Sequence, residues 1–303
     1  MKNEQPLISI AIITYNSSKY VLETLESMKA QTYRNIELII SDDCSTDNTV
    51  DICKDWIETN RDEFVRIELI TVDKNTGITA NANRALHLTE GKWIKLIAGD
   101  DIFFPQAVES HVKFISRAEN EDAVIIMSSV QLFKNTIENK LCVWPDFKFP
   151  DSRREQLRRQ LTGCFIMAPG VFIKREILVN KFGGFNEKYP MFEDDPLWIS
   201  YLSNGYKFYF NSDILAGYRM HDSSVSRTQF KVDFFNNLIS FKKEIVLPLM
   251  LKNGFYLEFL LCLTELYLIK KNICKGNRFL VKIIVRINTC LRKVLSLQLP
   301  RTS

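Results

Sequence analysis

The chain contains 303 residues, of which 46% are hydrophobic and 25% are charged, and its formal net charge is +4. This composition is typical of a folded globular protein and excludes a disordered or collagen-like chain. The seven cysteines form no CxxC pair, and the residues after Lys2 are polar where a secretory signal would be apolar. We therefore expect a protein of the reducing cytoplasm, without a zinc site or a disulfide framework.

Positive charge is concentrated near the C-terminal end of the chain. Residues 229–303 contain 13 Lys and Arg against four Asp and Glu, whereas residues 1–228 have a net charge of −5. This asymmetry predicts an acidic chemical domain over 1–228 and a basic helical extension over 229–303 that meets an anionic partner.

Strand and helix patterns alternate over the first 130 residues. Helical patterns cover Tyr20–Ala30 and the segment from Ser45 to about Trp56. Apolar runs rich in β-formers cover Leu7–Ile13, Ile36–Ile40, Ile67–Val72, Trp93–Ala98 and Ala123–Ser129. Strands separated by helices predict an α/β fold with a mainly parallel central sheet, flanked by helices and built with right-handed crossovers.

The second half of the chain has shorter patterns. Helices are expected at Arg153–Leu161 and Asp195–Ser203, and a strand and a helix within Gly170–Lys181. Short strands are expected at Tyr206–Phe210 and Ile214–Tyr218, whereas Thr136–Pro150 is expected to be an irregular connection.

Two apolar segments form the C-terminal tail. Phe255–Ile269 is interrupted by Glu258 and Glu265, so it is too short and too acidic for a membrane span. Arg278–Leu297 has basic residues near one helical face and apolar residues elsewhere. That pattern fits a helix lying on an anionic membrane surface, and it fits equally a helix packed on the core of the protein itself.

Asp100 and Asp101 follow the buried strand pattern Trp93–Ala98. Ligands in open α/β sheets bind beyond the carboxyl ends of strands. Adjacent carboxylates repel unless positive charge lies beside them, and a hard divalent cation that also holds a diphosphate meets that need. The alternative is a solvated acidic pair on a surface loop.

The ends of the first two strand patterns carry candidate nucleotide contacts. Thr14-Tyr15-Asn16 stands where a dinucleotide-binding enzyme would have a glycine-rich loop, and none is present. Asp43 follows the second strand and can accept hydrogen bonds from a base or ribose, or it can form an Asx turn that caps the next helix. Asn75 and Gly77 precede a helix on which Arg84 can reach a phosphate or form a surface ion pair.

Two later motifs complete the candidate set. Glu193-Asp194-Asp195 begins a predicted helix, where an acid can serve as a base in a cleft or simply cap the helix. His221 ends the run Tyr218-Arg219-Met220-His221 and can ligate a metal or contact phosphate, although a lone histidine is usually structural.

Together these pieces resemble the family-2 glycosyltransferases, which are inverting enzymes of the GT-A fold. The resemblance covers about residues 6–226, and it rests on the order and spacing of six motifs: Ser9–Asn16, Asp42–Asp47, Asn75–Arg84, Gly99-Asp100-Asp101, Glu193-Asp194 and Tyr218–His221.

The resemblance implies a role for each matching position. Thr14, Tyr15, Asn16, Asn75, Gly77, Arg84 and Asp100 would line the nucleotide-sugar pocket, and Asp43 would bind the base, usually uracil. Asp101 and His221 would hold Mn²⁺ or Mg²⁺. Asp194 would be the general base.

Two departures from the common family pattern bear on the expected function. Ala98 replaces the first acid of the DxDD motif, and no QxxRW run follows Asp194 within Asp195–Gly205, which argues against a processive synthase. The resemblance implies transfer of one sugar from a UDP-sugar to a glycan or lipid-pyrophosphate-linked acceptor of bacterial surface polysaccharide, such as O-antigen. The enzyme would be peripheral on the cytoplasmic face of the inner membrane, with an anionic membrane surface and no nucleic acid among its partners. The alternatives are a nucleotidyltransferase and a catalytically silent membrane-associated module.

Overall fold

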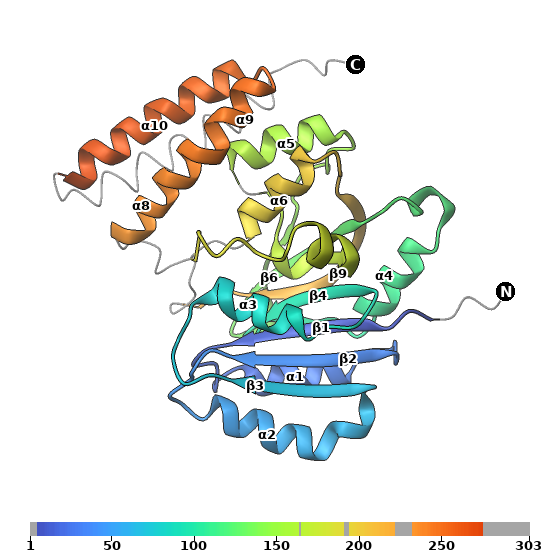
Figure 1. Ribbon diagram of the computed structural model, residues 1–303. Helices are drawn as coiled ribbons and strands as arrows, with labels where there is room; N and C mark the ends of the chain where they lie inside the picture. Colours follow the sequence, from blue (N-terminus) through green and yellow to red (C-terminus); the bar gives the residue numbers. More distant parts are fainter. Residues whose placement is uncertain (1–4, 164, 191–193, 222–231, 275–303) are drawn as a thin grey trace. The chain divides into compact units, whose positions relative to one another are not determined.

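The computed structural model describes residues 5–163, 165–190, 194–221 and 232–274 (Figure 1). The chain divides into two compact units. One comprises Met1–Arg153 and Ile166–His221, and the other comprises Arg154–Phe165 and Asp222–Ser303. The expected boundary at residue 228 therefore differs from the observed division, because the segment 154–165 groups with the C-terminal helices.

The first half of the sheet in the larger unit is parallel. Its strands lie in the order β3 (Arg66–Thr71), β2 (Ile36–Asp42), β1 (Ile8–Thr14) and β4 (Trp93–Ala98). The helices between them are α1 (Val21–Lys29), α2 (Thr49–Asn60) and α3 (Ile78–His87), and η1 (Arg61–Glu63) precedes β3. These strands match the expected runs to within one or two residues.

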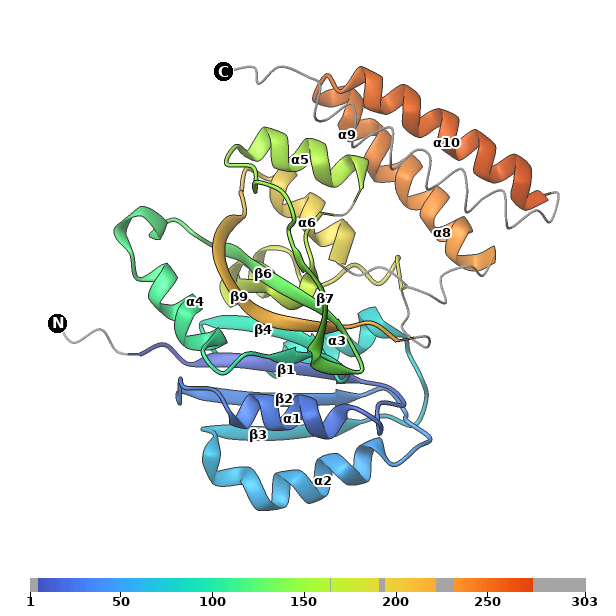
Figure 2. The ribbon, with the colours of Figure 1, turned by 180° about the vertical axis from the view of Figure 1, so that it is seen from behind.

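Helices cover both faces of these strands. Figures 1 and 2 show α3 on one face and α1 on the other. The pleat explains this arrangement, because successive side chains of a strand point to opposite faces. Ile10 and Ile12 pack with Leu25 of α1, whereas Ala11 packs with Ala85 of α3. Strands buried on both faces have near-continuous apolar sequences, and for this reason the sequence predicted the four parallel strands correctly.

The second half of the sheet mixes directions. Beyond β4 the order is β8 (Val171–Lys174), β6 (Ile125–Lys134), β9 (Tyr209–Arg219) and β5 (Ile102–Phe103), and β7 (Thr136–Trp144) pairs with β6 alone. The remaining elements of this unit are α4 (Ala107–Ile115), η2 (Ala118–Asn120), η3 (Ala168–Gly170), the π-helix η4 (Glu176–Lys181) and α6 (Asp194–Ser203).

Two expectations for this region were wrong. Most of Thr136–Pro150 is not irregular, since β7 forms an antiparallel hairpin with β6 through Asn135 at φ 65°. The side chains of β7 are mostly exposed, so no apolar alternation announces it. The two short strands expected after residue 206 are one strand, β9. Register shifts opposite Ser129 interrupt its alternation, as β-bulges do.

The smaller unit is helical. It contains α5 (Arg153–Thr162), α8 (Val232–Phe241), the π-helix η5 (Lys242–Val246), α9 (Leu247–Lys252) and α10 (Tyr256–Cys274). The amphipathic segment expected at Arg278–Leu297 lies outside the described residues. Among the described helices, none has the length and apolar character needed to cross a membrane.

Candidate active site

Most of the expected site residues follow the carboxyl ends of the parallel strands. In the register of the sheet, Thr14 at the end of β1 pairs with Asp42 at the end of β2, and Ile13 pairs with Ala98 at the end of β4. Because these strands are parallel, the segments that follow them emerge at one edge of the sheet. Asp43 and the pair Asp100-Asp101 therefore lie at a common edge, where ligands of open α/β sheets bind.

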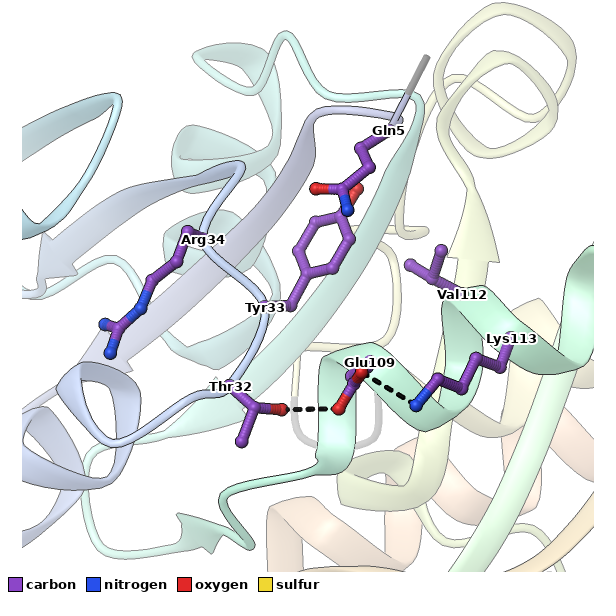
Figure 3. A pocket seen from close by; sticks show the side chains of 7 residues that line it. All are labelled: Gln5, Thr32, Tyr33, Arg34, Glu109, Val112 and Lys113. Carbon is purple, nitrogen blue, oxygen red and sulfur yellow. Dashed lines mark hydrogen bonds and ion pairs between the residues drawn. The ribbon is translucent and has the colours of Figure 1, made fainter. Parts of the chain in front are cut away.

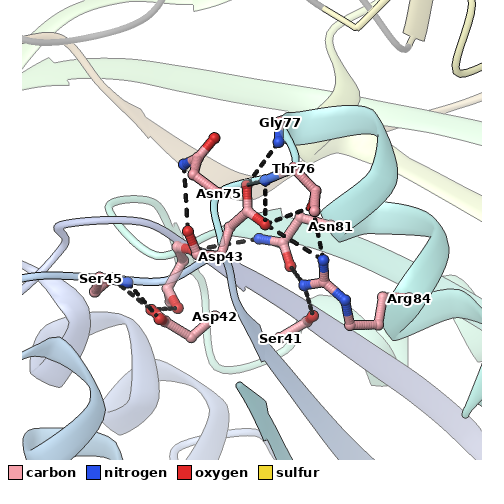
Figure 4. Close-up of polar contacts among 10 residues, drawn as sticks. Ser41, Asp42, Asp43, Ser45, Asn75, Thr76, Gly77, Asn81 and Arg84 are labelled. Carbon is pink, nitrogen blue, oxygen red and sulfur yellow. Dashed lines mark hydrogen bonds and ion pairs between the residues drawn. The ribbon is translucent and has the colours of Figure 1, made fainter. Parts of the chain in front are cut away.

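Asp43 is the centre of a polar network (Figure 4). Its carboxylate accepts hydrogen bonds from the Thr76 backbone N–H at 3.0 Å, the Thr76 hydroxyl at 2.6 Å and the Gly77 N–H at 2.7 Å. Gly77 precedes α3 at φ 92°, a conformation that strains other residues. The carbonyl of Asp43 accepts from the Asn75 amide at 3.2 Å. Asp43 thus fixes the loop that leads into α3.

Arg84 closes this network from α3. Its Nη2 lies 3.3 Å from Asp43 Oδ1 and donates to the Thr76 hydroxyl at 2.7 Å. Its Nη1 donates to Asn81 Oδ1 at 2.9 Å and to the Ser41 hydroxyl at 3.2 Å. The Arg84 guanidinium therefore holds the Asp43 loop together. It is not an isolated ion pair on the surface, and its Nη1 and Nη2 groups already have partners within the protein.

The β1–α1 loop forms the neighbouring wall of this edge. The Thr14 side chain is buried and donates to Asp42 Oδ2 at 2.7 Å, whereas Tyr15 is half exposed. Asn16 has a left-handed backbone, with φ 50°, and its Oδ1 accepts from the Thr46 N–H at 2.8 Å. The exposed Tyr15 ring is one side chain of this loop that is open to a ligand.

The Asx turn considered for Asp43 is made by its neighbour. Asp42 Oδ1 accepts from the Ser45 N–H at 2.8 Å and Oδ2 accepts from the Ser45 hydroxyl at 2.6 Å. Asp42 therefore shapes the turn toward α2, and Asp43 is left to organise the loop before α3.

Asp100 meets His221 at the same edge. His221 Nε2 lies 2.8 Å from Asp100 Oδ2, and both side chains keep some solvent exposure, 16% and 28%. The His221 ring also lies against Tyr20, with centroids 5.1 Å apart. An imidazole nitrogen and a carboxylate oxygen are thus together at the surface of the site.

Asp101 is placed differently from the expectation that it holds a metal. Its side chain is buried, and Oδ1 accepts from the Arg219 backbone N–H at 2.8 Å. Burial and the adjacent Asp100 charge raise the pKa of Asp101 well above its ordinary value, against the lowering effect of Arg219. The structure therefore brings Asp100, not Asp101, beside His221.

Arg219 is a residue whose role the sequence did not reveal. Its buried guanidinium donates from Nε to the Asp100 carbonyl at 2.7 Å and from Nη2 to Glu23 at 2.6 Å. Nη1 donates to the Asn135 carbonyl, and the group stacks over the Tyr20 ring at 4.6 Å. Arg219 thus holds the Asp100-Asp101 turn and carries His221 two residues later. The signal was its place within the motif Tyr218-Arg219-Met220-His221.

Asp194 begins α6, as expected for an acid at a helix start. The Asp195 N–H donates to its Oδ1 at 2.8 Å. Burial raises the pKa of the Asp194 carboxyl, and backbone N–H groups of Asp195 and Asp194 offset part of that rise. A carboxyl with a raised pKa is suited to accept a proton near neutral pH.

The segment before Asp194 is tied to α3. The Asn83 amide donates to the Phe185 carbonyl at 2.9 Å and to Glu187 at 2.8 Å, while the Phe185 N–H donates back to Asn83 Oδ1. The Thr79 hydroxyl donates to the Tyr189 carbonyl at 3.1 Å. The helix that carries Arg84 therefore also anchors the approach to Asp194. Glu193 lies outside the described residues.

The donor atoms fit a hard divalent cation that shares its coordination with a substrate. Over the residues that the structure describes, no cluster of three or more His, Cys, Asp and Glu side chains exists, so the protein would offer Asp100 and His221. Mg²⁺ is commonly held by one or two carboxylates together with substrate phosphates and water. The pair meets that requirement.

A cavity of about 280 Å³ lies away from these residues (Figure 3). It is lined by residues that precede β1 and β2 and by one face of α4, namely Gln5, Thr32, Tyr33, Arg34, Glu109, Val112 and Lys113. Glu109 is bound there by Lys113 at 2.7 Å and Thr32 at 2.9 Å. None of the predicted site residues lines this cavity.

Known proteins are similar to this chain over about three quarters of its length or more. The glucosyltransferase WfaP of Escherichia coli, described as a UDP-Glc:alpha-D-GlcNAc-diphosphoundecaprenol beta-1,3-glucosyltransferase, is 29% identical over 225 residues, covering 74% of this chain and 82% of WfaP. S. aureus TarS in complex with UDP-GlcNAc has a TM-score of 0.57 at 20% identity, covering 77% of this chain and 64% of that chain.

A second solved structure is similar over nearly the whole chain. The mannosyltransferase PcManGT of Pyrobaculum calidifontis, in complex with GDP-Man and Mn²⁺, has a TM-score of 0.56 at 17% identity, covering 96% of this chain and 88% of that chain. Both solved structures show the GT-A fold for this chain. The family model described as "Glycosyl transferase family 2" matches residues 9–180, more than half of the sequence. The chain therefore belongs to glycosyl transferase family 2.

Proposed function

We propose that this protein transfers one hexose from a UDP-sugar to a hydroxyl of a lipid-pyrophosphate-linked glycan, with inversion at the anomeric carbon. The observation that carries the proposal is the common strand edge at which the Asp43 loop and the Asp100–His221 pair lie. The Asp43 loop suits a nucleoside, and the Asp100–His221 pair suits a metal-bound diphosphate.

The donor assignment rests on Asp43 and its loop. Asp43 holds Thr76 and Gly77 in place by hydrogen bonds, and the half-exposed Tyr15 follows the neighbouring strand β1. Together they would form a polar wall for a base and ribose. WfaP is described as acting with UDP-Glc, and TarS is seen in complex with UDP-GlcNAc, which supports uridine as the base. Asn75 and Arg84 act through this loop.

Asp194 is the proposed general base. The acceptor hydroxyl loses its proton to the Asp194 carboxylate as its oxygen attacks the anomeric carbon, and the bond to the diphosphate breaks on the opposite face. A single displacement of this kind inverts the configuration. A positioned carboxylate contributes about 10²–10⁴-fold to such a step.

Asp100 and His221 are the proposed ligands for Mn²⁺ or Mg²⁺, and Asp101 supports them through Arg219. Such an ion, when bound, neutralises charge on the leaving diphosphate. The other task of the chain at this edge is orientation: Arg219 fixes the turn that presents Asp100, and the Tyr20 ring fixes the imidazole.

We infer the acceptor and the site of action from WfaP, which is described as acting on a diphosphoundecaprenol-linked sugar, an acceptor that resides in a membrane. We place the protein on the cytoplasmic face of the inner membrane as a peripheral enzyme of surface polysaccharide synthesis. Transfer is non-processive, since Asp195–Gly205 contains no QxxRW run.

The test is a donor screen against a synthetic lipid-diphosphate GlcNAc acceptor with Mn²⁺ or Mg²⁺. We expect UDP release and a product one hexose heavier by mass spectrometry with one UDP-sugar, and neither with GDP-mannose. Asp194→Asn serves as the catalytic control. Transfer from GDP-mannose alone would contradict the donor assignment, and the absence of both UDP binding and transfer would contradict the enzyme assignment.

A further inference from the structure

Helix α10 in the smaller unit carries large apolar side chains on its exposed side as well as on its buried side. The two acids that interrupt its sequence, Glu258 and Glu265, are buried, whereas several of its large apolar side chains are exposed. A helix that packs one face on its own core normally turns apolar side chains inward and charges outward. The exposed apolar side chains point to an apolar partner on the outer face.

Ion pairs within the smaller unit account for the buried acids. Glu258 Oε1 lies 2.5 Å from Arg158 Nη2 of α5, and Glu265 Oε2 lies 2.9 Å from Lys242 Nζ of η5. Buried charges are tolerated when they are paired in this way. The pairs fix which face of α10 turns outward.

The outward face is a continuous apolar stripe. Tyr256, Leu260, Leu263 and Tyr267 follow the spacing i, i+4, i+7 and i+11, so they lie along one side of the helix. Their exposed fractions are 65%, 59%, 40% and 64%, and Leu257 adds to the stripe at 44%. Single exposed apolar residues are ordinary, but a contiguous row marks a binding surface.

The exposed charges of α9 and α10 are all positive. Lys270 and Lys271 are exposed near the end of α10, and Lys252 is exposed at the end of α9. Neither α9 nor α10 exposes an acid. Tyrosines stand at both ends of the stripe, and these side chains favour the boundary between lipid and water.

We infer that the stripe from Tyr256 to Tyr267 lies in the plane of an anionic lipid surface, with Lys252, Lys270 and Lys271 on the lipid headgroups. This inference rests on the proposed function, which places the acceptor in a membrane. A second copy of the stripe would match the apolar residues but bring no negative charge to the lysines. The chain's own residues 275–303 contain seven Lys and Arg and no acid, so they offer no complementary charge either.

The experiment measures binding of the full chain to acceptor-free vesicles by sedimentation. The vesicles are phosphatidylcholine alone or with one quarter phosphatidylglycerol. We expect binding to the anionic vesicles that weakens with salt, because surface charges are screened within about 8–10 Å at physiological ionic strength. Leu260→Gln/Leu263→Gln is expected to reduce the partition coefficient at least about tenfold. Lys270→Gln/Lys271→Gln is expected to reduce the preference for anionic lipid.

The matched control is Leu88→Gln/Leu141→Gln, which makes the same change at exposed leucines of the larger unit and should leave binding unchanged. UDP release from the donor in the absence of vesicles separates this surface from the active site. The variants Leu260→Gln/Leu263→Gln and Lys270→Gln/Lys271→Gln should both keep this UDP release. Undiminished binding of Leu260→Gln/Leu263→Gln would overturn the inference, as would wild-type protein that ignores anionic vesicles while still releasing UDP. A wild-type dimer that this variant splits, without vesicle binding, would assign the stripe to a second copy instead.

Discussion

His221 Nε2 contacts Asp100 Oδ2 at 2.8 Å, across 121 positions of sequence. The contact joins the end of β9 to the turn after β4, and Arg219 bonds to the backbone of the same turn. The side chains that would meet a diphosphate therefore lie directly after two strands of the sheet, β4 and β9, within two residues of their ends.

Replacing Asp100 tests this pair. Asp100→Asn removes the negative charge while keeping the size of the side chain. We expect kcat to fall by about 10²–10³-fold, the scale of losing one electrostatic contact to a developing charge. The concentration of Mn²⁺ needed for half-maximal rate should also rise. Both are measured by UDP release against a metal titration.

Asp101→Asn is the comparison variant. Because Asp101 is buried and bonded to the Arg219 N–H, we expect a lower melting temperature with little change in the Mn²⁺ requirement. If Asp101→Asn, and not Asp100→Asn, raised the Mn²⁺ requirement, the metal would belong to Asp101, as the resemblance first implied.

Asp194→Asn tests the general base. We expect kcat to fall by about 10²–10⁴-fold with UDP affinity unchanged, since only the acceptor step requires this proton transfer. The pKa of Asp194 is raised by burial, so in the wild type kcat/KM should fall with decreasing pH at a higher pH than an ordinary aspartate would give. That acidic limb should be absent from the residual activity of the variant.

Asp195→Asn is the matched control, because Asp195 stands next in the same helix start. It should keep near-normal turnover and the acidic limb. Equal losses in the two variants would leave the base unassigned between them and would contradict the choice of Asp194.

Asp43→Ala tests the nucleotide loop. The change leaves the N–H groups of Thr76 and Gly77 without their acceptor, and we expect a loss of about 1–3 kcal/mol in the free energy of unfolding. UDP affinity measured by calorimetry should fall at least about tenfold if the loop forms the pocket wall. Asp73→Ala, an exposed acid of the same loop, is the control. Unchanged UDP affinity in Asp43→Ala would remove this loop from the nucleotide site.

The parallel half of the fold was predictable, and the contacts between distant residues were not. Local apolar runs such as Trp93–Ala98 announce buried strands, and six ordered motifs indicated the family. The sequence indicated Asp43, Gly77 and Arg84 as separate candidate site residues. Their mutual contacts depend on how β2 and α3 are placed in the fold, which no local pattern reveals. The sequence did not predict the β7 strand, because its side chains are mostly exposed and show no apolar alternation.

The roles of buried charges were hidden for the same reason. Arg219 acts on Asp101 across 118 positions of sequence, and nothing local marks that contact. Glu258 and Glu265 read as interruptions of an apolar helix, because their partners Arg158 and Lys242 come from other helices.

Lys95 gives a prediction about stability that is independent of the active site. Its side chain on β4 is fully buried, with Nζ 4.5 Å from the centroid of the Phe103 ring, and Nζ has no hydrogen-bond partner among the described residues. Burial lowers the pKa of Lys95 to about 7. His111 is also buried, and burial together with the nearby Lys95 lowers its pKa well below the ordinary value.

The sign of the pH dependence follows from proton binding. Between about pH 7 and the ordinary lysine pKa of about 10.4, the unfolded chain holds a proton at Lys95 that the folded chain has released. Stability therefore rises with pH across this window, and the cost of burying Lys95 is fully present below it. The lowered pKa of His111 adds a rise in the same direction at pH values below about 6.5.

Lys95→Met removes the ionisable group and keeps the length of the side chain. We expect the variant to be more stable than the wild type at pH 7 by on the order of 3 kcal/mol, with the difference shrinking toward pH 10. Urea unfolding at pH 7.0, 8.5 and 10 measures both. Lys92→Met, at an exposed position near the start of the same strand, should change stability little at any of these pH values. A stability difference between Lys95→Met and the wild type that is constant over this range would show that Lys95 remains protonated in the fold, and would contradict the lowered pKa.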